Sequence, residues 1–470
     1  MAGFKILFEK KLAKILLLGQ TVGMNYKSLD DHKQTEEKNR SDCPAPRVLS
    51  SPALIISNYI IKLSLLSFVF FAPISISGEQ ISLGLGFLGW VGYFFSTPKD
   101  NRAQILITPI GKAFFIFALA ALISVIFSEE KLAALNSFRS LWVIFAFFLG
   151  VNWIKSQKYL NLCIILLIIT ASVPSIIGIF QHLGGLKIWG YQFIDYKWGA
   201  TGFHHGSGSM TFAGVIMLVL LVGIPFLLVK KLEFQKIWLV IPLIFLIIAF
   251  LLSWERGAWL GFLGGIVFWG AFQGKRALFL LIFIFSVGAG ITNKLNPDIW
   301  VRAASIFNIE ITPSNSAGQR ILIWNLSLQV FKDHPLTGSG FNQFEKYADA
   351  IIQPKTKVSS IQITTCHAHS NLLQILATTG ILGLIAFLYL WIIVFLELFR
   401  NLRVASPNLY PYYLGVLCAL VGFHIEGFFE YTFGDAEIIT LIWFLLGGAI
   451  ALGKSEETKS ISSQPQAAIT

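Results

Sequence analysis

Charged residues are scarce in this sequence of 470 residues: Asp, Glu, Lys and Arg make up 13% of it, whereas 55% of the residues are hydrophobic. A soluble globular domain carries about 25% charged residues, so this composition excludes a protein whose surface is mostly exposed to water. The apolar residues gather in runs, several of which reach the length of about 17 to 25 residues that crosses a bilayer as a helix. The sequence therefore predicts a polytopic membrane protein.

Cysteine is also rare, with four residues far apart in the chain and no CxxC pair: Cys43, Cys163, Cys366 and Cys418. This spacing excludes a disulfide framework and a zinc site built from paired cysteines. Clustered Asp ligands are missing from the long polar segment as well. We therefore expect neither a metal nor a cofactor.

Acidic residues are fewer than basic ones, 25 against 36, which gives a formal net charge of +11. The Lys and Arg residues lie in short segments between apolar runs and form no basic arm with interleaved aromatics, so we do not expect a nucleic-acid partner. Their distribution instead indicates topology, because short cytoplasmic loops are rich in Lys and Arg. With a cytoplasmic N-terminus, the rule places Arg256 and residues 184–206, 294–369 and 426–437 on the outer face.

About twelve apolar runs predict an all-α fold, a polytopic protein with about 12 transmembrane helices. One large extracytoplasmic loop is expected to form a small helical cap, with helical pieces at 321–331 and 341–352, because loops this long without a role are uncommon. The predicted parts are a cytoplasmic amphipathic and disordered segment 1–51, transmembrane helices 1–9 in 52–292, the large loop 293–369, transmembrane helices 10–12 in 370–453, and a cytoplasmic tail 454–470.

The polar segment and the end of one earlier apolar run hold the residues that could carry chemistry. Arg256 could pair with the adjacent Glu255 or extend to the membrane surface, and Arg320 could be a solvated residue at a helix start. An arginine fork is, however, well suited to bind a phosphate through paired donors. His369 could cap or pack a helix, but a histidine side chain, with an ordinary pKa near 6.5, is also suited to accept a proton from a hydroxyl group.

Three motifs occur around the large loop in a fixed order. They are Ser253-Trp254-Glu255-Arg256-Gly257, then Gly318-Gln319-Arg320 with His334-Pro335-Leu336-Thr337-Gly338-Ser339-Gly340, then Ala368-His369-Ser370-Asn371-Leu372-Leu373-Gln374. Together they resemble the O-antigen ligase and O-antigen polymerase family, whose members are bacterial polytopic membrane glycosyltransferases. The resemblance covers about 240–383.

The resemblance implies roles for individual residues. Arg256 and Arg320 would bind the diphosphate of the donor, and His369 would be the catalytic base in an inverting, metal-independent transfer. His367 is the alternative base or a substrate contact. Independently of the resemblance, the predicted position of four residues in outer loops makes them further candidate substrate contacts: His204, His205, Glu430 and Asp435. The two acidic residues could instead pair with an arginine.

The resemblance also implies partners and a location. The donor would be a glycan linked to undecaprenyl diphosphate, and the protein would lie in the bacterial inner membrane with its active site on the periplasmic face. A ligase would use a lipid A core oligosaccharide as acceptor, whereas a polymerase would use a growing glycan. A protein O-oligosaccharyltransferase and a polysaccharide transporter are the remaining alternatives.

Overall fold

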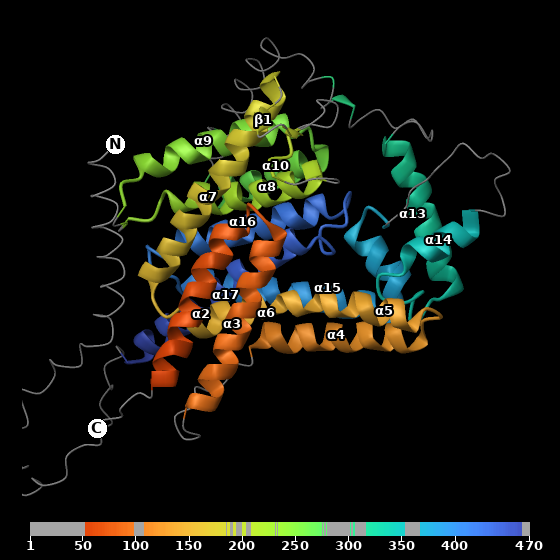
Figure 1. Ribbon diagram of the computed structural model, residues 1–470, viewed down its shortest axis with the longest axis horizontal. Helices are drawn as coiled ribbons and strands as arrows, with labels where there is room; N and C mark the ends of the chain where they lie inside the picture. The colour runs from red at the N-terminus through yellow and green to blue at the C-terminus, as the bar shows by residue number, and fades with distance from the viewer. Residues whose placement is uncertain are drawn as a thin grey trace, which may run out of the picture. The chain divides into compact units, whose positions relative to one another are not determined.

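The computed structural model describes residues 52–97, 108–184, 186–188, 191–193, 200–203, 208–230, 232, 234–274, 276, 279, 301, 304–305, 316–352 and 367–462. Apart from one antiparallel hairpin, β1 (Leu186–Ile188) with β2 (Tyr191–Phe193), the elements in these ranges are helices, as Figure 1 shows. The all-helical class predicted from the sequence is therefore confirmed, and the hairpin is a small addition that the apolar pattern does not predict.

The helices follow the predicted apolar runs closely. They are α2 (Pro52–Phe71), α3 (Ile76–Ser96), α4 (Pro109–Phe127), α5 (Lys131–Phe138), η2 (Arg139–Ile144), α6 (Phe145–Trp153), α7 (Gln157–Gly184), α8 (Gly208–Phe226), α9 (Ile237–Leu252), α10 (Arg256–Gln273), α13 (Ser316–Asp333), α14 (Phe344–Ile352), α15 (Asn371–Val404), α16 (Tyr410–Glu426) and α17 (Ala436–Ser462).

Seven stretches in the described part of the chain are long and apolar enough to cross a membrane: α2, α4, the stretch Lys131–Trp153, α7, α8, α15 and the first part of α17. A polytopic membrane protein is thus confirmed. Helices α3, α9, α10 and α16 occupy the positions of four further predicted spans. The run predicted at 277–291 lies outside the described residues apart from Phe279, so the total of about twelve spans stays a prediction.

Local sequence signals set where these helices begin. Ser75 precedes α3 and its hydroxyl accepts the N–H of Gly78 at 3.3 Å, while Thr108 does the same for Gly111 at 3.1 Å before α4. Pro109 is the first residue of α4, a position where its missing N–H costs no hydrogen bond. At 1.5 Å per residue, α4 is roughly 28 Å long, close to the thickness of a bilayer core.

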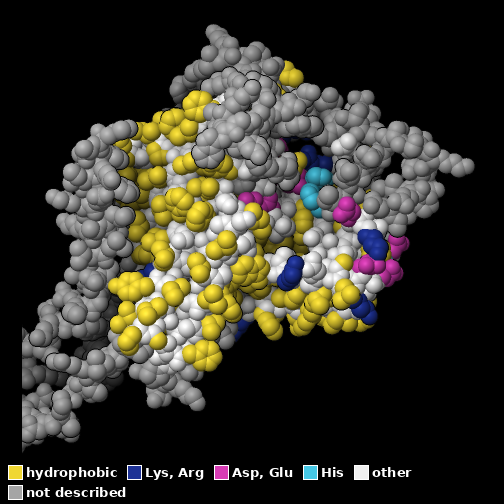
Figure 2. Space-filling model, in the orientation of Figure 1, with side chains coloured by type: hydrophobic (Ala, Val, Ile, Leu, Met, Phe, Trp, Pro, Cys, Tyr) yellow, Lys and Arg dark blue, Asp and Glu magenta, His cyan; other side chains and the backbone are white. Residues whose placement is uncertain are grey.

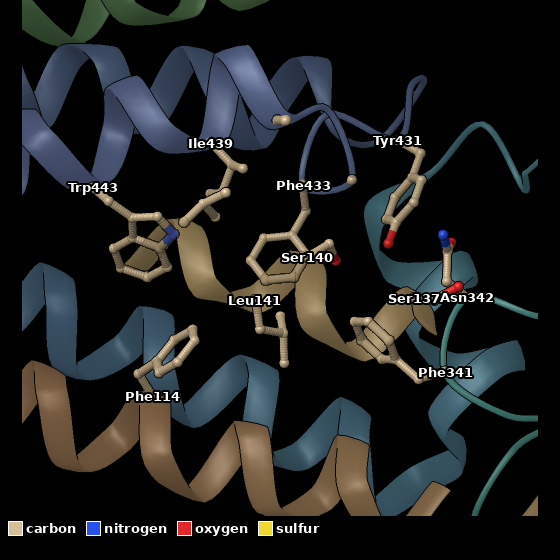
Figure 3. Close-up of a pocket in the computed structure, with 13 residues that line it drawn as sticks. Phe114, Ser137, Ser140, Leu141, Phe341, Asn342, Tyr431, Phe433, Ile439 and Trp443 are labelled. Atoms are coloured by element: carbon tan, nitrogen blue, oxygen red, sulfur yellow. The ribbon is translucent and has the colours of Figure 1, made fainter. Parts of the chain in front are cut away.

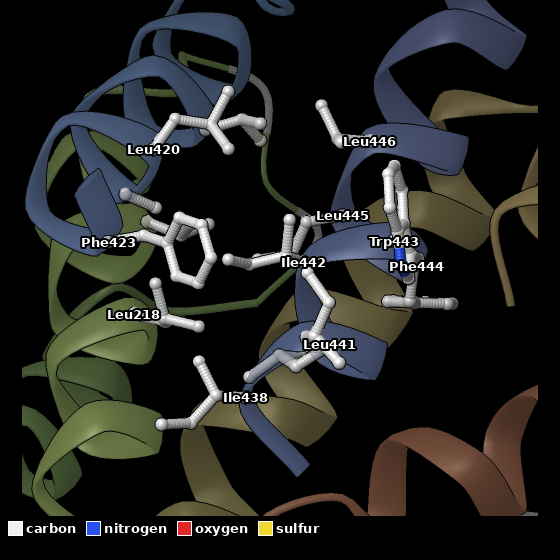
Figure 4. Packing of buried hydrophobic residues seen from close by; sticks show 14 of the residues in the cluster. Leu218, Leu420, Phe423, Ile438, Leu441, Ile442, Trp443, Phe444, Leu445 and Leu446 are labelled. Atoms are coloured by element: carbon white, nitrogen blue, oxygen red, sulfur yellow. The ribbon is translucent and has the colours of Figure 1, made fainter. Parts of the chain in front are cut away.

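The inner and outer helices differ in burial. In α8 and α17, 83% and 89% of the apolar window is buried, compared with 33% in α2. Buried side chains of α8, α16 and α17, among them Leu218, Phe423 and Trp443, pack together at the centre (Figure 4). The outer helices instead leave large side chains such as Phe95 and Phe115 exposed, and Figure 2 shows hydrophobic side chains over the part formed by α2 and α3. An apolar surface of this extent marks a membrane-facing side.

Helix α15 is interrupted near its start. Gly380 has φ +64°, and residues 335–340 supply partners for the backbone on both sides of the break. Ser339 and Gly340 donate their N–H groups to the carbonyls of residues 377 and 378 at 3.0 and 3.1 Å, while residues 381 and 382 donate to the carbonyls of 335 and 336 at 2.9 and 3.4 Å. A Cβ on Gly380 would lie 2.3 Å from the carbonyl oxygen of Leu336, so this approach requires glycine.

The described part of the large loop forms a small helical unit on α15. The helical pieces predicted at 321–331 and 341–352 are present as α13 and α14. Ile323, Val330 and Phe344 are buried between them, and this cluster also includes Ala377 of α15 and Ala368, which precedes it. The small core therefore ties α13 and α14 to the start of α15, where the histidine motif lies.

Candidate active site

The histidine motif immediately precedes α15. The buried N–H of Ala368 donates to Oε1 of Gln374 at 2.7 Å, and Nε2 of Gln374 donates to Oδ1 of Asn342 at 3.1 Å. His369 has φ +45°, a left-handed conformation that is uncommon for a residue with a side chain and that clusters at functional sites. The resulting turn brings the ring centroids of His367 and His369 to 4.3 Å from each other.

Asn371 holds the loop between α16 and α17 against this motif. Its backbone N–H donates to the carbonyl of Gly427 at 2.7 Å, its Nδ2 donates to Oγ1 of Thr432 at 3.0 Å, and its Oδ1 accepts the N–H of Phe433 at 2.9 Å. A Cβ on Gly427 would lie 2.2 Å from Nδ2 of Asn371, so a side chain there would push the two segments apart. These contacts fix the position of Glu430, which lies between Gly427 and Thr432.

Glu430 is the centre of the candidate site. Nδ1 of His369 lies 3.0 Å from both carboxylate oxygens, and Nε2 of His367 lies 3.6 Å from Oε1. Nη2 of Arg320, on α13, lies 3.5 Å from Oε2. The structure therefore brings together four of the residues singled out in the sequence, and it gives Glu430 the arginine partner that was one of its two expected roles.

Arg256 is the first residue of α10 and is buried. Its Nη1 donates to the carbonyl oxygen and to Oγ of Ser305 at 2.9 and 2.8 Å, while Ser209 donates to Oε1 of the neighbouring Glu255 at 2.6 Å.

Helices α10 and α13 both approach the Glu430 loop at Phe429. A Cβ on Gly257, the residue after Arg256, would lie 3.9 Å from Cβ of Phe429, and the ring of Trp324 on α13 lies 6.5 Å from that of Phe429. The helices that carry the two arginines thus approach the same residue, next in sequence to Glu430. In Figure 2, histidine and charged side chains gather on the side of the molecule where α13 and α14 lie.

The charges around Glu430 set its protonation state. Burial alone would raise the pKa of this carboxyl group, but the hydrogen bond from His369 and the positive charges of the two histidines and Arg320 outweigh it and lower the pKa to about 2. Glu430 is therefore a carboxylate at neutral pH. Burial lowers the pKa of His367 against the opposing effect of Glu430, which favours the neutral form of this imidazole.

A buried carboxylate beside a histidine defines which imidazole nitrogen can react. Because Glu430 accepts a hydrogen bond from Nδ1–H of His369, the neutral ring has its free lone pair on Nε2. Catalytic triads hold their histidine base in the same way. With this geometry Nε2 of His369 is free to accept a proton, and the carboxylate of Glu430 orients the ring.

The same three side chains have the composition of a metal site. His367, His369 and Glu430 each offer one ligand atom, and these atoms lie within 4.8 Å of one another. The sequence did not suggest this group because Glu430 lies 61 residues beyond His369. Arg320 on the same carboxylate opposes a divalent cation there, since both would compete for one negative charge.

The remaining candidate residues have different surroundings. Asp435 accepts Oγ1–H of Thr211 at 2.5 Å and, through Oδ1, the N–H groups of residues 437 and 438 at 3.1 and 3.3 Å, so it caps α17 and ties it to α8. His204 and His205 lie outside the described residues. No role was expected for Asn371 and Gln374, although both belong to the motif that follows His369.

A family comparison covers the part of the chain that contains most of these residues. Residues 241–388 match the family model Wzy_C, described as O-antigen ligase, and this stretch contains Arg256, Arg320, His367 and His369. A search of curated proteins found no match. The match ends before Glu430, which reaches the site only through the fold. The chain is therefore a polytopic membrane enzyme that carries an O-antigen ligase family domain in residues 241–388.

Proposed function

We propose that this protein transfers a glycan from undecaprenyl diphosphate to a hydroxyl group of a lipid A core oligosaccharide, on the periplasmic face of a bacterial inner membrane. The observation that carries the proposal is the contact of Nδ1 of His369 with Glu430, which leaves Nε2 as the proton acceptor. The family match supports a lipid-linked glycan as the substrate class. The identity of the acceptor is tested by a transfer assay with and without a lipid A core.

The proposed reaction is a single displacement with inversion. The acceptor hydroxyl gives its proton to Nε2 of His369 while its oxygen attacks the anomeric carbon of the donor sugar. The bond from that carbon to the diphosphate oxygen breaks, and undecaprenyl diphosphate leaves with the bonding electron pair. Glu430 stabilises the imidazolium formed in this step, because its carboxylate faces the protonated Nδ1.

The two arginines would stabilise the leaving group. Negative charge grows on the diphosphate as the glycosidic bond breaks, and guanidinium groups held in place beforehand lower the energy of that transition state. In the structure Arg320 is 22% exposed and its 3.5 Å contact with Glu430 is too long for a strong hydrogen bond, so its guanidinium group is available to a diphosphate. Arg256 would hold the same group from α10.

We further propose that the transfer needs no metal ion, because the arginines supply the positive charge that a divalent cation provides in other enzymes. The test is activity in the presence of EDTA. Full activity is the expected result, whereas a loss that is restored by magnesium or zinc would assign the three ligand atoms around Glu430 to a metal.

The main experiment measures transfer by the purified protein from an undecaprenyl-diphosphate glycan, with and without a lipid A core acceptor. The variants His369→Ala and Arg320→Ala should both lose activity. His334→Ala is the matched control, because its ring packs on Tyr347 in the helical unit, 5.2 Å between centroids, and is not part of the Glu430 cluster.

Each result has a separate meaning. Product that forms only with the core acceptor, is lost in both variants and persists in the control supports the ligase. Chain elongation without the core would make the enzyme a polymerase. No transfer to any acceptor, including a protein, would contradict the glycosyltransferase and favour a transporter.

A further inference from the structure

A partly open pocket of about 110 Å³ lies beside the histidines, between α4, the α5–η2 segment and the start of α17. Figure 3 shows that its two ends differ: Tyr431, Asn342 and Ser137 lie at one end, and Phe114 and Trp443 lie at the other. No step of the proposed transfer involves the residues that line this pocket. Its polar end, however, adjoins the residues that perform them.

Two connections join the polar end to the candidate base. Tyr431 follows Glu430 in the chain, and its ring centroid lies 5.8 Å from that of His367, which is itself 4.3 Å from that of His369. Asn342 is bound through Gln374 to the backbone between the two histidines. A ligand at this end of the pocket would therefore lie next to the reacting groups.

The lining indicates the chemical class of the ligand. The described residues around the pocket include several aromatic rings, a few hydroxyl and amide groups and no charged side chain. Aromatic faces suit the C–H faces of a sugar ring, whereas hydroxyl and amide groups suit its hydroxyls. A lining without charge does not suit a diphosphate. The pocket volume is several times the roughly 10 to 15 Å³ that one water needs. It is on the scale of a single sugar ring.

The position of the pocket distinguishes the two sugars of the reaction. Arg320 contacts Oε2 of Glu430, whereas His367, which leads to the pocket, contacts Oε1. Arg320 and the ring that leads to the pocket thus approach Glu430 at different carboxylate oxygens. A diphosphate at Arg320 and a ligand in the pocket would then be separated by the pair formed by His369 and Glu430. An inverting displacement requires the nucleophile to approach from the side opposite to the leaving group.

We propose that this pocket binds the sugar ring of the acceptor that carries the reactive hydroxyl. The inference rests on the proposed function, because it takes the arginines as the diphosphate site. Phe341 and Tyr431 would pack on the ring, and Asn342 and Ser137 would bind its hydroxyls. The acceptor would thus be recognised mainly through one neutral, terminal ring.

The experiment blocks the pocket without disturbing the fold. Ser140 lines the pocket and is exposed, so Ser140→Phe fills space that is open in the native protein. Asn136→Phe is the matched control, because Asn136 is an exposed residue one turn earlier that does not line the pocket. Calorimetry on the full-length protein in nanodiscs would measure binding of two probes: the core oligosaccharide freed of lipid A, and the free oligosaccharide of the repeat unit.

We expect one probe to bind the native protein and Asn136→Phe with the same affinity, and to bind Ser140→Phe at least tenfold more weakly. The probe that binds identifies the acceptor. Equal binding in both variants, or no binding of either probe to the native protein, would overturn the pocket assignment. Because binding needs no catalysis, these outcomes are separate from the transfer assay. The transfer assay gives a further check. If Ser140→Phe has the acceptor KM of the native protein but a higher donor KM, the assignment of the pocket to the acceptor is also overturned.

Discussion

Replacing Glu430 by glutamine should disable the enzyme while leaving its shape almost unchanged. Against the effect of burial, the hydrogen bond from His369 and the charges of the two histidines and Arg320 lower the pKa of Glu430 from 4.5 to about 2, a net shift of about 3 kcal/mol in favour of the charged form. The same charge stabilises the His369 imidazolium that forms during transfer. If the transition state loses about 3 kcal/mol, kcat falls roughly 100-fold.

A second effect of Glu430→Gln increases the loss. The glutamine amide can donate a hydrogen bond to Nδ1 of His369, which would place the ring proton on Nε2 and remove the base. Loss of the corresponding carboxylate in serine proteases costs about 10⁴-fold for this reason. We therefore expect kcat to fall by about 10² to 10⁴, with a much smaller change in acceptor KM.

The assay measures kcat at saturating donor and acceptor for the native protein, Glu430→Gln and Glu345→Gln, a control at an exposed glutamate in the first turn of α14. Thermal unfolding in detergent confirms that each variant is folded. A folded Glu430→Gln enzyme whose kcat stays within about threefold of native would refute the role assigned to this carboxylate.

Three other predictions concern binding, local structure and pH. Arg320→Lys should raise the donor KM about tenfold, measured by varying the donor, because a lysine keeps the charge but loses the paired donors. Gly338→Ala should lower the thermal midpoint of unfolding by several degrees, since a Cβ there would lie 2.3 Å from the backbone of Thr378 at a residue with φ +68°. His367 should make stability fall as pH drops below about 6.5, because its lowered pKa means that the unfolded chain binds the proton more readily than the native protein. The slope of the thermal midpoint between pH 7 and pH 5 should therefore decrease in His367→Gln.

Each of these predictions has a control. Arg320→Lys should leave the acceptor KM unchanged, and a larger effect on the acceptor than on the donor would contradict the assignment of Arg320 to the diphosphate. Gly84→Ala, where the added Cβ meets nothing within 4 Å, should keep the native midpoint. An unchanged pH slope in His367→Gln would show that other groups control the loss of stability in acid.

The sequence predicted those features that depend on residues close together in the chain. Apolar runs report helices directly, and α9 has the bounds predicted from its run. Glu430 was proposed only as a substrate contact or an ion-pair partner, because its place beside His369 depends on Asn371 holding a loop from 61 residues away. The break at Gly380 was also not predicted, since an apolar run continues through it without a change in composition.

The interrupted helix α15 has a consequence for how substrates reach the site. Lifting the unit formed by α13 and α14 would break the four backbone hydrogen bonds between residues 335–340 and the two sides of Gly380. Each buried backbone group left without a partner costs about 1 to 3 kcal/mol, so this movement is strongly opposed. These bonds therefore hold the unit against α15, and we expect a substrate with a lipid tail to enter and leave sideways, within the plane of the bilayer.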